Sequence, residues 1–288
     1  MSDTFIPRIP LGSWVEDVVD WVTSAWKPFF TIVKNVVLSI YDAVDWVLAT
    51  PPFWAVGLVL VLAALLASGW RLALGSAVGL VVVAGLDQWE NAMDTLALVI
   101  VASVIALLVA IPLGIWAARS DRVSAVVRPV LDFMQTMPAF VYLIPTVVIF
   151  LTGAVPGIVA TVIFALAPGV RFTELGIRQV DAEVVEAGHA FGSTPGRILR
   201  QIQLPLAMPT IMAGVNQVIM LALSMVVIAG MVGADGLGKP VVAALQRVDV
   251  GPGFEAGLAV VILAIYLDRV TAALSGRAKV ARTRQAHA

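Results

Sequence analysis

The sequence contains no cysteine, only two histidines and few charged residues. The absence of cysteine excludes disulfide bonds, thiolate nucleophiles and cysteine-based metal sites. The two histidines, His189 and His287, are too few and too widely separated for a metal cluster, so we expect no metal site. Charged residues make up only 13% of the 288 positions, whereas hydrophobic residues make up 60%. A soluble protein of this length needs far more polar surface, so the composition predicts an integral membrane protein.

The charge balance and the N-terminus exclude two further features. The net charge of −1 gives no indication of nucleic acid or another highly charged partner. The N-terminus has no basic segment leading directly into an apolar stretch, and Asp3, Glu16 and Asp17 are acidic. We therefore expect no cleaved signal peptide.

Residues 13–48 carry apolar side chains at steps of three or four, with polar side chains on the opposite face. This spacing predicts an amphipathic helix, and Pro28 predicts a bend within it. Tryptophans favour the depth of the membrane interface, and four occur here: Trp14, Trp21, Trp26 and Trp46. We expect an interfacial helix; the alternative is a helix packed on neighbouring helices of the same protein.

Seven apolar stretches follow, and each is predicted to be a membrane-spanning helix. They cover residues 53–68, 70–86, 91–118, 129–153, 156–172, 206–232 and 255–274. The first two are short and are joined only by a tight turn at Gly69. The fold class expected is all-α, with about seven transmembrane helices after the interfacial helix.

Lysine and arginine residues are concentrated in alternate loops. The basic regions are 119–128, 171–200 and 277–284, whereas the opposite loops at 87–94 and 235–249 are mainly acidic. Basic loops face the cytoplasm, so seven spans place the N-terminus outside and the C-terminus inside.

The segment G-A-D-G-L-G-K at residues 233–239 nearly matches a phosphate-binding loop. However, Pro240 stands where serine or threonine would hold Mg²⁺, and proline lacks an N–H for the first helical turn. No strand is predicted before the segment, and the predicted topology places it outside the cell. We therefore expect a simple turn, so that the chain has no ATPase site of its own and is not an enzyme.

A polar stretch between two apolar ones carries the chain's strongest pattern. Residues 186–205 read E-A-G-H-A-F-G-S-T-P-G-R-I-L-R-Q-I-Q-L-P. This resembles the cytoplasmic signature loop of ABC importer permeases: E-A-A, three residues, G, nine residues, I, one residue, L-P. The matching residues are Glu186, Ala187, Gly192, Ile202, Leu204 and Pro205. Gly188 is the one departure, since it replaces the second alanine.

The local sequence of this loop predicts two short helices that meet at Gly192, with Thr194 and Pro195 beginning the second. We call the compact projection formed by these two helices the knob. The resemblance implies a type I ABC importer permease fold in which the knob fits a groove on a separate ATPase subunit. That subunit binds ATP and Mg²⁺. The coupling residues that the resemblance implies are Glu186, Ala187, Gly188, Phe191, Gly192, Ile202, Leu204 and Pro205. The last three are expected to join the knob to the next span.

A second stretch, L-D-F-M-Q-T-M-P at residues 131–138, resembles a span of the permeases for glycine betaine, choline and related quaternary amines. Residues 205–217 and 221–229 are similar to glycine betaine/proline betaine permeases. The resemblance covers about residues 89–274. It implies a permease homodimer with two ATPase subunits and an extracytoplasmic substrate-binding protein, importing a betaine by alternating access. It implies no cofactor on this chain.

Polar side chains within the predicted spans are candidates for the translocation path. They are Gln135, Thr136, Asn216, Gln217 and Ser224, with Met225 beside them. Such side chains equally form hydrogen bonds between helices, so both interpretations stay open. Asp132 lies one helical turn from Arg128, which predicts a local ion pair rather than a role in transport.

The predicted organisation has an amphipathic segment (1–50), a transmembrane hairpin (51–88), a permease core (89–275, with the coupling loop at 173–205) and a basic cytoplasmic tail (276–288). The expected location is a bacterial or archaeal plasma membrane. Alternatives of the same class are permeases for choline, carnitine or another small solute. A secondary transporter or channel is a different class and typically contains buried charges, broken helices or inverted repeats. The predicted spans are nearly free of charge and show no repeat.

Overall fold

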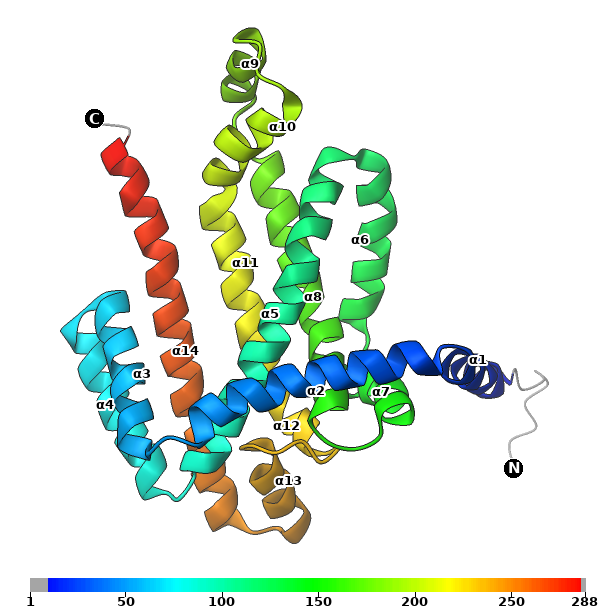
Figure 1. Cartoon of the computed structure of the whole chain (residues 1–288), viewed down its shortest axis with the longest axis vertical. Helices are drawn as coiled ribbons and strands as arrows, with labels where there is room; N and C mark the ends of the chain where they lie inside the picture. Colours follow the sequence, from blue (N-terminus) through cyan, green and yellow to red (C-terminus); the bar gives the residue numbers. More distant parts are fainter. Residues whose placement is uncertain (1–9, 286–288) are drawn as a thin grey trace, which may run out of the picture.

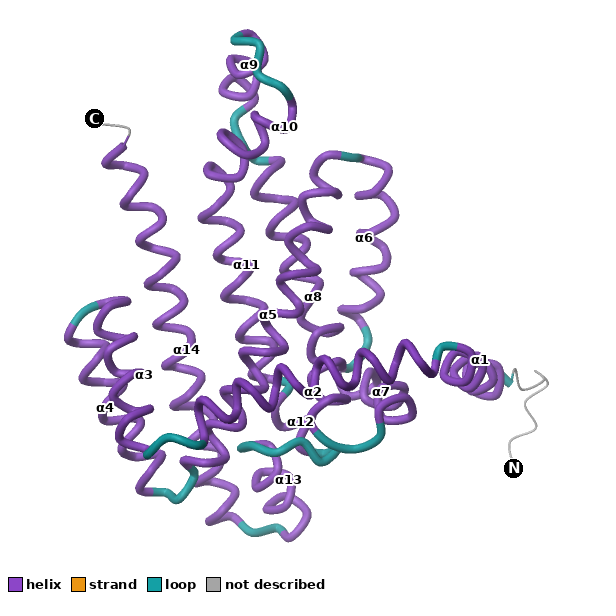
Figure 2. Tube along the Cα trace, in the orientation of Figure 1, coloured by secondary structure: helices purple, strands orange, loops and turns teal. Residues whose placement is uncertain are grey.

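The computed structural model describes residues 10–285, with side chains described for residue 10 and residues 12–273. Helices joined by short turns make up this part of the chain, as Figure 2 shows, and no β-strand occurs within it. The expected all-α class is therefore confirmed. In Figure 1 most of the long helices run side by side, with both ends of the bundle carrying short helices.

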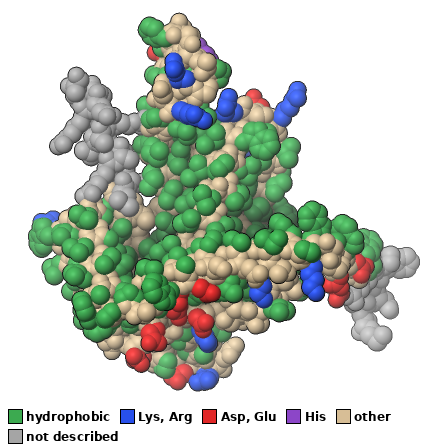
Figure 3. All heavy atoms as spheres, in the orientation of Figure 1, with side chains coloured by type: hydrophobic (Ala, Val, Ile, Leu, Met, Phe, Trp, Pro, Cys, Tyr) green, Lys and Arg blue, Asp and Glu red, His purple; other side chains and the backbone are tan. Residues whose placement is uncertain are grey.

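The N-terminal segment forms two helices, α1 (Leu11–Ala25) and α2 (Lys27–Ala49). The break falls at Trp26, and Pro28 lies in the first turn of α2, where a proline is tolerated. In Figure 1 α2 runs across the long helices rather than along them. Val37 and Tyr41 pack on the bundle, whereas many apolar side chains of α1 and α2 are exposed along the surface seen in Figure 3. This is the arrangement of an interfacial amphipathic helix.

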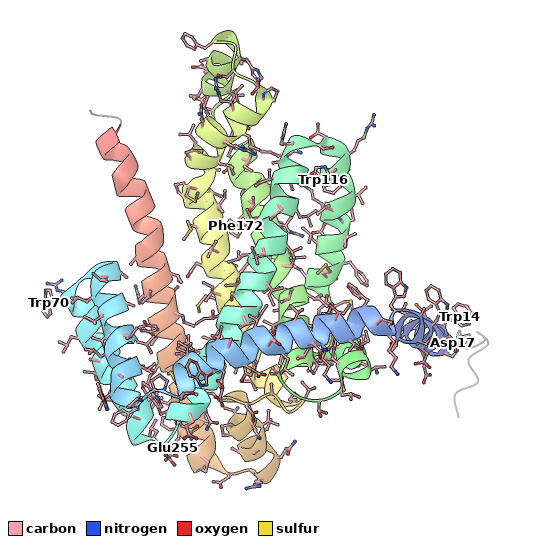
Figure 4. The ribbon with its side chains drawn as sticks, in the orientation of Figure 1. Trp14, Asp17, Trp70, Trp116, Phe172 and Glu255 are labelled. Atoms are coloured by element: carbon pink, nitrogen blue, oxygen red, sulfur yellow. The ribbon has the colours of Figure 1, made fainter. Side chains whose placement is uncertain are left out.

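Residues 53–85 form a hairpin of two 16-residue helices, α3 (Phe53–Ser68) and α4 (Trp70–Gly85). Gly69 turns the chain with a φ of 89°, which a residue without Cβ adopts easily. At a rise of roughly 1.5 Å per residue each helix is about 24 Å long, shorter than the ~30 Å hydrocarbon core of a bilayer. Figure 4 places Trp70, at the hairpin tip, well short of the level of Trp116. The hairpin therefore covers only part of the height of the bundle.

Three helices form the centre of the bundle: α5 (Trp89–Arg119), α8 (Ala154–Arg178) and α11 (Leu204–Ser224). Glycines let their backbones approach closely. A Cβ added to Gly114 of α5 would lie 2.6 Å from Thr173 Cβ of α8. A Cβ added to Gly214 of α11 would lie 2.6 Å from Phe172 Cβ of α8. The last helix, α14 (Val250–Gln285), packs against α11.

The predicted span 129–153 is not one straight helix, which corrects the expectation. α6 (Asp121–Thr136) is followed by a 3₁₀ turn (Ala139–Tyr142) and α7 (Leu143–Phe150), and the helix axis bends by 106°. Met137 and Pro138 both have an extended backbone. Met137 leaves the helical region because it precedes a proline. Apolar residues continue through the bend, so hydropathy alone does not reveal it.

Two short helices, α12 (Val226–Gly230) and α13 (Gly238–Arg247), close one end of the bundle. They meet at two glycines, since a Cβ on Gly230 would lie 2.4 Å from the Gly238 carbonyl carbon. The phosphate-loop-like residues 233–239 form the turn between these helices and the first residues of α13. The predicted turn is therefore confirmed.

Within residues 10–285, four helices are each long and apolar enough to cross a membrane. They are α5, α8, the continuous helix Pro195–Gly230 and residues Val250–Ala273 of α14. Up to six spans result if each strongly bent helix pair counts as one, the pairs being α2 with α3 and α6 with α7. Of the seven spans expected from the sequence, only the one at α4 is absent from this larger count, because α4 is a shorter apolar helix.

Candidate coupling and translocation site

The predicted knob consists of α9 (Ala182–Ala190) and α10 (Pro195–Ile198), which project beyond the bundle at the end where α14 also ends (Figure 1). Asp181 caps α9, because its Oδ1 accepts a hydrogen bond from the Glu183 N–H at 2.9 Å. Thr194 holds the N-cap position of α10, as predicted. Its carbonyl, rather than its side chain, accepts hydrogen bonds from the next turn.

Gly192 forms the corner between the two knob helices, with a φ of 75°. Its N–H donates to the His189 carbonyl at 2.8 Å, and the Ser193 N–H donates to the Gly188 carbonyl at 3.1 Å. This pair of bonds is a Schellman motif, which needs a left-handed residue at the corner. A Cβ on Gly192 would meet no described atom within 4 Å. Backbone conformation, and not lack of space, therefore favours glycine here.

Gly188, the departure from the family pattern, is buried beneath the knob. A Cβ there would lie 2.8 Å from Ile202 Cδ1 and 3.3 Å from Ile198 Cγ1. Glycine lets both isoleucines pack directly on α9. These contacts are the ends of flexible side chains, so the alanine of the family pattern fits after a small shift.

The outer surface of the knob exposes an aromatic side chain. Phe191 is 90% exposed at the tip, and Glu186 and Ala187 are exposed beside it. A large apolar side chain held in water on a rigid projection is typical of a protein–protein contact. The knob is therefore a candidate docking surface.

The knob continues directly into the next span. A π-helical segment, η2 (Leu199–Gln203), joins α10 to α11 without a break, and Pro205 lies in the first turn of α11. Leu199 is buried and Leu204 half-buried in a cluster with residues of α5 and α8. The knob and α11 are therefore joined by continuous backbone and packed side chains.

A buried carboxylate lies at the knob end of α8. Glu174 is 3% exposed and accepts hydrogen bonds from Ser124 Oγ at 2.7 Å and Arg128 Nη2 at 2.8 Å, both on α6. Arg178 Nε lies 2.9 Å from the same oxygen, Glu174 Oε1. Arg178 also pairs with Asp121 at 2.8 Å and donates to the Ala117 carbonyl at 2.8 Å. This charge cluster joins α5, α6 and α8 just before the knob begins.

Glu174 is not among the predicted site residues, because its α6 partners lie 46 and 50 residues away along the chain. A signal was present: a lone glutamate in an apolar span, one helical turn before Arg178. The predicted Asp132–Arg128 pair is wrong, since Arg128 binds Glu174 and Asp132 pairs with Arg171. These side chains line a polar cavity of about 350 Å³.

Four of the predicted path residues lie exposed on the bundle surface: Gln135, Thr136, Gln217 and Ser224. The Thr136 and Ser224 hydroxyls donate to carbonyls of their own helices, at 2.9 Å each. Hydrogen bonds between helices are not found for these four side chains within the described residues. These four residues stay candidates for lining a path, because their side chains are exposed on the surface of the single chain.

The other two path candidates have packing partners. Met225 is fully buried in a cluster with Tyr142, so it does not line an open path here. Asn216 Nδ2 donates to Asp268 Oδ1 at 3.2 Å, and the Thr271 hydroxyl donates to Asn216 Oδ1. Asn216 therefore links α11 to α14. Asp268, like Glu174, corrects the expectation that the spans are nearly free of charge.

Comparison with known proteins identifies this architecture. Residues 110–280 match the family of binding-protein-dependent transport system inner membrane components. The chain belongs to this family. The glycine betaine/carnitine transport permease GbuB of Listeria monocytogenes is 51% identical over 95% of this chain and 98% of its own length. The glycine betaine transport permease OpuAB of Bacillus subtilis is 46% identical over 92% of this chain and 94% of its own length.

A third relative of this permease is the glycine betaine/proline betaine transport permease ProW of Escherichia coli. It is 47% identical over 92% of this chain and 75% of its own length. Among solved structures, the MetNI methionine ABC transporter in inward-facing conformations aligns with a TM-score of 0.60. The alignment covers 66% of this chain and 95% of that chain, at 20% identity. The fold is therefore that of a type I ABC importer permease, and the chain is a multi-pass transport subunit.

Proposed function

We propose that this permease imports glycine betaine, proline betaine and similar compatible solutes as the transmembrane subunit of an ATP-driven importer. The relatives that match at 46–51% identity over nearly the whole chain carry glycine betaine in their names. The polar residues expected to line the path are neutral. This suits a solute that bears both a permanent positive charge and a carboxylate, because a strong counter-charge would retain it. Carnitine, in the name of one relative, is the second candidate.

The knob carries the proposal for energy coupling. Its tip presents Phe191 to an ATPase subunit, and Glu186 and Ala187 flank that aromatic side chain. Ile202, Leu204 and Pro205 lie in the continuous helical path from the knob to α11. Closure of two ATPase subunits on ATP would displace two knobs and switch the spans between inward- and outward-facing states.

The proposed assembly contains a permease homodimer, two ATPase subunits and an extracytoplasmic substrate-binding protein. ATP and Mg²⁺ bind the ATPase, and this chain carries no cofactor. The segment 233–239 supports this division of labour, because Pro240 follows it where a Mg²⁺ ligand would be needed. The Glu174 cluster fastens α6 to α8 beside the knob, so the inner ends of these spans would move together.

A paired substitution tests the coupling proposal. Gly192→Val forces a β-branched residue into a left-handed corner, whereas Gly196→Val changes an exposed helical glycine without steric contact. In proteoliposomes holding the complete transporter, Gly192→Val should reduce ATP-dependent glycine betaine uptake by about tenfold or more, since left-handed strain costs roughly 1–2 kcal/mol. Gly196→Val should remain near wild type. Equal uptake by the two variants would reject the knob as the coupling element.

A competition experiment tests the substrate. If excess glycine betaine did not compete with the uptake of choline or carnitine, glycine betaine would be rejected as the substrate.

We also propose that the knob faces the cytoplasm, with the N-terminus outside and the C-terminus inside. If α2 and the short hairpin are not counted, the four single spans and the α6–α7 pair make five crossings. Five, like the seven predicted from the sequence, is an odd number, so the two ends of the chain lie on opposite sides. Acidic side chains gather at the end opposite the knob in Figure 3. Impermeant maleimide applied to intact cells should label Val248→Cys, an exposed residue after α13, but not Arg122→Cys, in the first turn of α6. The reverse labelling would invert the topology.

A further inference from the structure

The short hairpin and α14 enclose a cavity that contains none of the knob residues or predicted path residues. The cavity has a volume of about 200 Å³ and runs from Arg71, near the hairpin tip, to Val83. These residues are 12 apart on α4, which corresponds to roughly 18 Å. One leaflet contributes about half of the ~30 Å hydrocarbon core, so this length suits a single acyl chain.

Two glycines on α4 determine where the cavity opens. A Cβ on Gly79 would lie 2.8 Å from Ile262 Cγ2, so α4 presses on α14 at that level. One turn closer to the tip, a Cβ on Gly75 would meet no described atom within 4 Å. The two helices therefore separate toward the tip. Gly75 and Ile265 are exposed at this opening, which leaves the cavity accessible from the surrounding bilayer.

A hydroxyl group without a partner lies inside the cavity. Ser76 is only 7% exposed, and its Oγ forms no hydrogen bond within the described residues. Ser103 Oγ, buried on α5, likewise has no partner, whereas Thr161 and Thr173 donate to carbonyls one turn back, at 2.7 and 2.8 Å. Of the two unpartnered serine hydroxyls, Ser76 is the one that lines this cavity. A buried donor left unsatisfied is costly, so Ser76 points to a ligand that supplies an acceptor oxygen.

Positive charge lies at the open end of the cavity. The Arg71 guanidinium stacks over Trp70 at 5.7 Å, and no carboxylate pairs with Arg71 within residues 10–273. Arg269 lies one helical turn beyond the cavity residues Ile265 and Tyr266 on α14, and its side chain is 69% exposed. Its nearest carboxylate, Asp268, is at the 4.0 Å limit of an ion pair.

We propose that this cavity, the α4–α14 lipid site, binds an anionic phospholipid. Arg71 and Arg269 contact the phosphate, Ser76 donates to an acyl ester carbonyl, and one acyl chain lies along α4. Ser76 is five residues from Arg71, about 7.5 Å along the helix, and an ester lies a few bonds below the phosphate. The hairpin is too short to reach the far membrane surface, so arginine side chains at its tip extend toward the headgroups.

Native mass spectrometry of the purified transporter complex tests the site. The complex is exchanged from nanodiscs of equal phosphatidylglycerol and phosphatidylcholine into mild detergent, and the retained lipids are counted. Wild type should retain phosphatidylglycerol preferentially. Arg71→Gln should weaken that retention about tenfold, as loss of one charge-assisted contact implies. Arg122→Gln, on α6, is the matched control and should retain lipid like wild type.

A second pair of variants separates lipid loss from misfolding. Gly75→Leu fills the cavity, whereas Gly85→Leu adds the same side chain to an α4 position that also lacks close contacts but lies outside the cavity. Gly75→Leu should retain neither phosphatidylglycerol nor phosphatidylcholine. Its melting temperature should equal that of Gly85→Leu. Retention of phosphatidylglycerol by Gly75→Leu, or equal retention by Arg71→Gln and Arg122→Gln, would overturn the proposal. Uptake is not the readout, so the transport function is tested separately.

Discussion

The central helices and the N-terminal hairpin have similar apolar compositions but are held together differently. In the centre, α5, α8 and α11 meet at glycines such as Gly114, where no space remains for a methyl group. A buried charge cluster around Glu174 joins α5 and α8 to α6 at the knob end. In the hairpin, α4 touches α14 closely at Gly79. A hydrogen bond also joins α14 to α3, from the Tyr266 hydroxyl to the Leu60 carbonyl at 2.9 Å. Close backbone packing between several helices is therefore a property of the central bundle, whereas the hairpin is attached at few points.

The largest effect should follow loss of the buried carboxylate. Glu174→Ala leaves Arg128 and Arg178 without their shared partner, and loss of hydrogen bonds to a charged group costs roughly 1.5–3 kcal/mol. Asp121→Ala removes an exposed partner of the same Arg178, for which roughly 0–1 kcal/mol is expected. Thermal unfolding in detergent measures the difference. Similar melting temperatures would mean that the cluster does not hold α6 to α8.

A smaller effect should come from glycine substitutions in the two regions. Gly114→Ala forces a methyl group into Thr173 and the Val170 carbonyl, and such overpacking costs about 1–3 kcal/mol. Gly75→Ala adds a methyl group without close contact and should stabilise α4 by roughly 0.5–1 kcal/mol. Denaturant titration of both variants tests whether the comparison holds. Destabilisation by Gly75→Ala would show that the hairpin is packed as tightly as the centre.

The smallest effect separates structural from path residues on α11. Asn216→Leu removes the hydrogen bonds to Asp268 and Thr271 and should destabilise the protein by about 1–2 kcal/mol. Gln217→Leu changes an exposed neighbour, so stability should be unchanged while the rate of betaine uptake falls. Unfolding and uptake are measured for both. If Gln217→Leu lost stability, or if Asn216→Leu lost none, the assignment of Asn216 as the structural residue and Gln217 as the path residue would be wrong.

Local patterns were read reliably from the sequence. The helical class, the break next to Pro28, the two knob helices and the corner at Gly192 each depend on a few adjacent residues or on fixed spacing. Apolar runs likewise located the long spans. Hydropathy did not reveal how sharp the bend at Met137–Pro138 is, because Met137 to Phe140 are all apolar and the predicted span runs through them.

The sequence by itself determined that this protein is a helical membrane permease with a signature loop, because composition, periodicity and motif spacing are local properties. Only the tertiary structure decided which charges meet, which polar side chains face another helix and how deep the hairpin reaches. Glu174 and Asp268 find partners from 46 to 52 residues away. Such pairings depend on how helices cross, and the helix crossings are set by close contacts at glycines that no single segment of sequence specifies.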